Sequence, residues 1–128
     1  MPTLDPQLED LGMANEGTTV KLGGQLLDED EAAVPLAGVA SLKLWVTNES
    51  SGAVINGRAG TNILNANGGT LHPTSGAWTL KLASADSPIV VAGSPYERHR
   101  ILVEWTYNAG VDKGTWEGVL TVRNLSQI

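Results

Sequence analysis

The sequence predicts an all-β fold, and three observations support this prediction. Val, Thr, Trp and Gly are plentiful, and no long segment keeps the 3.6-residue apolar period of a helix. Short runs that alternate apolar and polar residues are separated by turn signals, which is the pattern of β-strands. The stretch 98–124 contains two such runs around a short turn and gives the strongest β-hairpin signal in the chain.

Each run of this hairpin has one mainly apolar face, because side chains alternate between the two faces of a strand. Matching the apolar faces places Trp105 opposite Trp116, with a four-residue loop at 109–112. The same register places Glu104 opposite Glu117, and directly opposed like charges are unfavourable. Either a basic side chain from a neighbouring strand lies between them, or the register is shifted by a bulge. The predicted pairs are Trp105–Trp116, Val103–Gly118 and Ile101–Leu120.

Length, charge and cysteine content limit the class of protein. The chain has 128 residues, enough for one domain with a core. Its net charge of −6 argues against nucleic-acid binding, and the absence of Cys excludes a disulfide framework and a thiolate metal site. No apolar run approaches the roughly 20 residues of a membrane-spanning helix. The N-terminus is acidic and lacks signal-peptide features, so we expect synthesis in the cytosol without export by that route.

Two parts of the chain are predicted, an N-terminal arm at 1–17 and a β-sandwich domain at 18–128. The arm is mostly polar or acidic, and Leu4, Leu8 and Leu11 would share one face of a helical turn. Such a segment is either a frayed terminus or an arm that docks on a neighbouring subunit.

The domain is predicted to have six or seven short strands with turn signals between them, including the hairpin. This pattern favours an antiparallel β-sandwich of the immunoglobulin kind. Gly23 and Gly24 mark a bulge or a close backbone approach. Residues 89–91 form either a short edge strand or a covering loop. The strands before the hairpin are expected at 18–28, 41–47, 53–55, 61–66 and 77–83.

The tryptophans supply most of the aromatic side chains, since Phe is absent. Trp78, Trp105 and Trp116 fall on apolar faces, which favours a place in the core over a role in stacking on sugars. Trp45 falls on the polar side of its strand. It is therefore either a partly exposed residue at an interface or a residue covered by a loop.

No catalytic, cofactor-binding or metal-binding residue is predicted, and the chain is not expected to be an enzyme. His72 and His99 lie in no metal-binding spacing and are both predicted at the surface. The acidic run 28–31 lacks the Gly and Glu that a calcium loop needs at its sixth and twelfth positions, so it is predicted to be a solvated turn. Glu104 and Glu117 resemble a glycosidase carboxylate pair in spacing, but a flat sheet face excludes water poorly.

Several ordered segments resemble small immunoglobulin-like proteins of tailed bacteriophage particles, including baseplate and tail modules. The resemblance covers residues 17–124. It departs at 93–96, where a Gly-x-Tyr is common in those domains and this chain has Gly-Ser-Pro-Tyr. The segments that carry it are Val34–Ala40, the strand Leu42–Thr47, the stretch Ser75–Leu82 with Ala85–Asp86 (similar to G-x-W-x-L-x-L-x-x-x-D), and the closing Leu120–Val122.

The resemblance implies a non-enzymatic structural protein of a tailed-phage virion, made in the bacterial host cytoplasm. It would act by subunit contact in the head, the head–tail junction or the tail. Its partners would be other virion proteins and copies of itself, with no nucleic acid, membrane or cofactor. The alternative is a carbohydrate-binding or adhesin-type β-sandwich module, whose partner would be a surface glycan.

Overall fold

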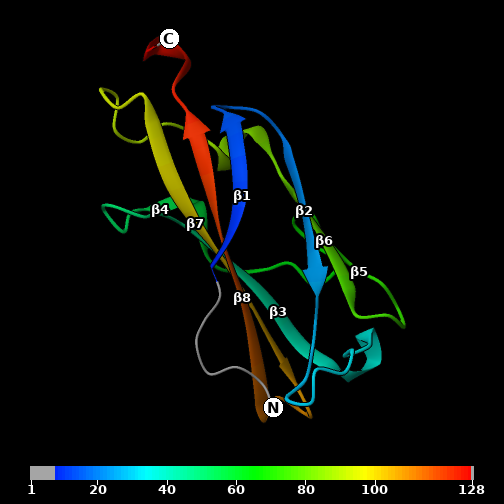
Figure 1. The fold of residues 1–128 in the computed structure, drawn as a ribbon. Coiled ribbons are helices and arrows are strands. Elements are labelled where there is room, and N and C mark those ends of the chain that lie inside the picture. Colours follow the sequence, from blue (N-terminus) through cyan, green and yellow to red (C-terminus); the bar gives the residue numbers. More distant parts are fainter. Residues whose placement is uncertain (1–7, 128) are drawn as a thin grey trace.

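A computed structural model describes residues 8–127, in which eight strands form two packed sheets (Figure 1). The all-β prediction is confirmed, because the described residues contain no α-helix and only three single 3-10 turns. Those turns are η1 (Leu36–Gly38), η2 (Ser84–Asp86) and η3 (Leu125–Gln127). The strands are β1 (Leu8–Asn15), β2 (Val20–Gln25), β3 (Val39–Asn48), β4 (Val54–Asn62), β5 (Gly69–Leu71), β6 (Ala77–Leu82), β7 (Tyr96–Tyr107) and β8 (Asp112–Arg123).

The larger sheet has the strand order β1-β8-β7-β3-β4, and the smaller has the order β2-β6-β5. All paired strands are antiparallel except β1, which runs parallel to β8. The core lies between the sheets and is built from alternate positions, as the predicted apolar faces require. It includes Leu42, Leu44 and Val46 of β3, Trp78, Leu80 and Leu82 of β6, and Ile101, Val103 and Trp105 of β7.

The segment predicted as an arm contributes a strand to the larger sheet. Residues 8–15 form β1, so the helical turn expected through Leu8 and Leu11 is wrong over the described residues. The pairing of β1 with β8 supplies main-chain hydrogen bonds that a local apolar pattern does not reveal. Leu11 packs beside Gly118, where an added Cβ would lie 2.8 Å from Leu11 Cδ1. Residues 1–7, including Leu4, lie outside the described residues.

The register predicted for the closing hairpin is wrong by two residues. Trp105 pairs with Gly114, not with Trp116, and the loop covers 108–111. Asn108 and the next two residues all have positive φ, and Asn tolerates this left-handed conformation, so the turn begins one residue earlier than predicted. A shift of two residues keeps every side chain on its face. The observed pairs are Trp105–Gly114, Val103–Trp116, Ile101–Gly118 and His99–Leu120.

The tryptophans are arranged differently from the predicted Trp105–Trp116 pair. Trp105 is buried with its ring over Gly114, where an added Cβ would lie 2.4 Å from Trp105 Cε2. Trp116 is half-buried and makes an edge-to-face contact with Trp78 of the smaller sheet, with ring centroids 5.0 Å apart. The core prediction is confirmed for Trp78 and Trp105, while Trp116 lies at the edge of the core.

Other strand boundaries also differ. A single strand, β4, runs through 54–62 in place of the strands predicted at 53–55 and 61–66, and residues 63–66 are not in a strand. Residues 89–91 belong to a loop. β5 was not expected from the sequence. Gly24 marks a close approach, since an added Cβ would lie 2.8 Å from the Trp78 ring, and β2 pairs with β6 without a register shift.

Candidate functional site

Exposed apolar side chains are found in the segments at the end of the molecule where β7 begins and β8 ends. The loop 88–95 crosses this end, and the C-terminal turn η3 lies beside it (Figure 1). Four large apolar side chains here are between 41% and 51% exposed. We call this set of side chains the apolar end, and it consists of Val90, Val91, Tyr96 and Leu125.

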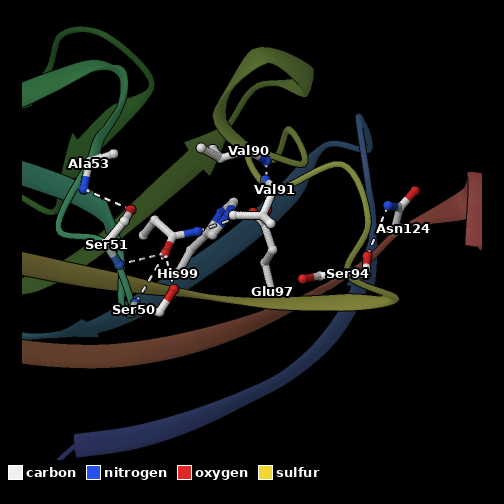
Figure 2. Close-up of polar contacts among 10 residues, drawn as sticks. Ser50, Ser51, Ala53, Val90, Val91, Ser94, Glu97, His99 and Asn124 are labelled. Atoms are coloured by element: carbon white, nitrogen blue, oxygen red, sulfur yellow. Dashed lines mark hydrogen bonds and ion pairs between the residues drawn. The ribbon is translucent and has the colours of Figure 1, made fainter.

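Beneath the loop, the carboxylate of Glu97 accepts four hydrogen bonds (Figure 2). The backbone N–H groups of Val90 and Val91 both donate to Oε1, the former at 2.7 Å. His99 Nε2 donates to Oε2 at 3.0 Å, and Asn48 Nδ2 donates to the same oxygen at 3.3 Å. Because Glu97 is only 6% exposed, these donors replace the water that an ionised carboxylate would otherwise bind.

The donors keep Glu97 ionised in spite of its burial. Burial by itself raises the pKa of the carboxyl group. The N–H groups of Val90 and Val91, followed by His99, outweigh that effect, and the pKa of Glu97 lies below its usual value. The loop backbone and the carboxylate therefore stabilise one another.

The prediction that His99 lies at the surface is wrong, because its side chain is fully buried on the inner face of β7. Its Nε2 carries the proton that is donated to Glu97, since an ionised carboxylate only accepts. Its Nδ1 has no hydrogen-bond partner among the described residues. His72 is exposed, as predicted.

Two buried asparagines, Asn48 and Asn124, connect the region around Glu97 and His99 to neighbouring turns. Asn48 Oδ1 accepts hydrogen bonds from the backbone N–H groups of Ser50 and Ser51, which fixes the turn between β3 and β4. Asn124 Nδ2 donates to the carbonyls of Ala92 and Ser94 at 3.0 and 2.9 Å, and so holds the second half of the loop. We call Asn48, Glu97, His99 and Asn124 the polar cluster.

The polar cluster positions the loop in addition to any contribution it makes to the stability of the fold. Buried charged groups can often be replaced by apolar ones of similar volume without loss of stability. An apolar replacement of Glu97 could not bind the N–H groups of Val90 and Val91, however. The cluster therefore fixes the backbone of a segment whose apolar side chains point to solvent, which is an arrangement suited to contact with another surface.

A second buried charge, Asp86, joins the two sheets. Its carboxylate pairs with Arg58 of β4, at 2.9 Å to Nε, and also accepts hydrogen bonds from Asn56 and from the N–H of Ala83. Burial alone raises the pKa of Asp86, but Arg58 and Asn56 outweigh it and hold the pKa below its usual value. Asp86 is the final residue of the sequence pattern that resembles phage domains, and it has a structural role here.

Two hollows lie away from the apolar end. A groove of about 580 Å³ runs over the outer face of the smaller sheet, where Lys21 and Lys81 are directly opposed. A cleft of about 480 Å³ lies at the other end of β7, between the loop 26–38 and the closing hairpin.

The remaining residues considered from sequence do not form a site. Glu104 lies opposite Thr115, and Glu117 lies opposite Leu102, so the expected carboxylate pair is not formed. Trp45 is half-buried, and its ring lies beside Gly60 of the neighbouring strand β4. Among residues 8–127, no group of three His, Cys, Asp or Glu side chains is placed to hold a metal ion.

Comparison with known proteins gives no relative from which a function could be transferred. No family model, curated protein or solved structure matches this chain. Over the described part of the chain, no helix has the length and apolar character needed to cross a membrane.

Proposed function

We propose that this chain is a non-enzymatic structural protein of a tailed-phage virion that acts through subunit contacts. One observation carries the contact role: Val90 and Val91 are each 45% exposed on a loop whose backbone is bonded to the buried Glu97. Fixing a loop before it binds lowers the entropy cost of association. The assignment to a phage particle rests on the sequence resemblance described above. The partners would be other virion proteins or copies of this chain.

An immunoglobulin-like sandwich is part of the proposal, and the strand order supports it. In variable-type immunoglobulin domains, one sheet contains strands G, F, C and C′, and the facing sheet contains B, E and D. Here β8-β7-β3-β4 corresponds to the first set in order, and β2-β6-β5 corresponds to the second. The parallel strand β1 then extends the first sheet beyond G.

The test is the presence of the chain in particles purified from the host that carries its gene. Mass spectrometry should find it at a fixed ratio to the major virion protein, and its absence would refute the proposal. The double variant Val90→Ser/Val91→Ser should enter particles roughly tenfold less, which corresponds to about 1.4 kcal/mol of lost contact energy. Val111→Ser is the matched control, since Val111 is 77% exposed at the far end of β7. Equal incorporation of both variants would exclude the apolar end as the contact surface.

A carbohydrate-binding module is the alternative, and it has less support. Sugar-binding surfaces need exposed aromatic faces, whereas Trp78 and Trp105 are at most 4% exposed and Trp45 and Trp116 are half-buried. A glycan array, with Trp45→Ala as control, separates the two functions. Specific binding of one glycan together with absence from particles would favour the alternative.

A further inference from the structure

The cleft beside the closing hairpin has a wall of aromatic rings. Trp105 and Tyr107 lie on the inner face of β7, and Trp116 lies next to them on β8. Its volume of about 480 Å³ is within the range of small-ligand sites, which is about 300–1,000 Å³. The cleft is at the opposite end of β7 from the apolar end, so an occupant here is independent of the contacts proposed above.

The polar atoms of these three rings are already bonded within the protein. Trp105 Nε1 donates to the carbonyl of Leu27 at 3.2 Å, and Trp116 Nε1 donates to Glu9 Oε2 at 3.0 Å. The Tyr107 hydroxyl donates to Glu29 Oε2 at 2.6 Å. Trp105 is buried, so the carbon surface still open to a ligand is that of Tyr107 and Trp116, which are half-buried. Such a surface attracts cations through its negative face.

The rest of the cleft is strongly acidic. Asp28, Glu29 and Glu31 line it, against Lys113 as the one basic lining residue in the described structure. Lys113 is itself near a carboxylate, with Nζ 3.7 Å from Glu104 Oε1. The lining therefore favours a cation over an anion.

The kind of cation follows from the arrangement of the acidic groups. Among the described residues, the carboxylates of this loop do not gather as a metal-binding group. A cation that extends along both the rings and the acidic loop fits better than a compact ion. A planar guanidinium does this, because it stacks on aromatic faces while its N–H groups donate to carboxylates.

We propose that this cleft binds an arginine side chain of a partner protein. The guanidinium lies against Trp116 and Tyr107, and the carboxylates of Glu29 and Glu31 accept its hydrogen bonds. A neutral oligosaccharide is less suited, because the ring N–H and O–H groups that would bind its hydroxyls are already used.

The test is an NMR titration with the peptide acetyl-Gly-Arg-Gly-amide, followed through the tryptophan indole resonances. The expected result is saturable shifts of Trp105 and Trp116, with Trp45 as the internal reference. The same peptide with citrulline in place of arginine has nearly the same shape without charge. It should bind roughly tenfold more weakly, and higher salt should weaken the arginine peptide several-fold because the charges are near the surface.

Two variants make the test specific to the cleft. Glu31→Gln removes a lining carboxylate that accepts none of the hydrogen bonds within residues 8–127, so the fold should be kept, while affinity for the arginine peptide falls several-fold. Glu117→Gln is the matched control on the outer face of β8 and should change nothing. The proposal would be overturned by any of three results. The arginine and citrulline peptides could bind with equal affinity, or the two variants could have equal effects. The third result is that a neutral oligosaccharide shifts the resonances and the arginine peptide does not.

Discussion

Replacing Glu97 by Gln tests whether the buried cluster needs a carboxylate that accepts hydrogen bonds from both His99 and Asn48. Gln has the same shape and keeps one carbonyl oxygen for the N–H groups of Val90 and Val91. Its amide nitrogen takes the place of Oε2, so His99 Nε2 and Asn48 Nδ2 both lose their acceptor. Asn48 cannot compensate by rotating its amide, since its own oxygen is bonded in the β3–β4 turn.

The expected loss follows from these two donors. Leaving a buried donor unsatisfied costs about 1–3 kcal/mol, so Glu97→Gln should lower the free energy of unfolding by roughly 2–4 kcal/mol at pH 7. For a domain of this size that corresponds to a fall in Tm of roughly 10 °C. Denaturant unfolding and thermal circular dichroism measure the two quantities. Glu49→Gln is the control, since Glu49 makes a surface ion pair with Arg98 that contributes only about 0–1 kcal/mol.

The difference in stability between the wild-type protein and Glu97→Gln should depend on pH. The pKa of Glu97 is lower in the folded protein than in the unfolded chain, where it is about 4.3. The stability that this group contributes is therefore present above about pH 4.3 and is lost as the pH falls through the folded pKa. The wild-type protein should approach the stability of Glu97→Gln as the solution is acidified. A gap that is below about 0.5 kcal/mol at pH 7, or that stays constant down to pH 3, would contradict the role given to Glu97.

Two further predictions concern the closing hairpin. Gly114→Ala should lower the free energy of unfolding by about 1–3 kcal/mol, since the new Cβ would meet the Trp105 ring. Gly93→Ala is the control and should have little effect, because the space around its Cβ is open. Similar losses in both variants would contradict the packing of Trp105 on Gly114. The hydrogen bond to Glu29 raises the pKa of Tyr107 to about 12, so ultraviolet titration should show one tyrosine ionising near that value. Glu29→Gln should return it toward about 10, and an unchanged titration would refute the contact.

Alternation with period two predicted the buried faces of β3, β6 and β7, because the two faces of a strand are a local property of the backbone. The same alternation, carried back from Ile101, places His99 and Glu97 on the inner face. That signal could have located the polar cluster. The polar character of the two side chains argues against this placement, since charged residues are seldom buried without partners. The partners are a loop and a strand distant in sequence.

Period-two alternation does not determine the register of the closing hairpin. A shift of two residues leaves each apolar face intact, so matching the faces of Trp105 and Trp116 cannot choose between registers. The choice is made at the turn, where Asn108 adopts positive φ. The aromatic wall of the cleft depends on this register, because it is Gly114, opposite Trp105, that lets the indole ring lie flat against β8.

The sequence by itself determined that the chain is all-β and that the apolar faces of β3, β6 and β7 are buried, since both follow from short-range alternation and turn chemistry. Only the tertiary structure decided that residues 8–15 join the larger sheet, because β1 is held by parallel pairing with a strand about a hundred residues away. It also decided that Glu97 and His99 are buried and that three acidic residues lie beside three aromatic rings. Contacts of this kind join segments whose spacing in the sequence carries no periodic signal, so local patterns cannot predict them.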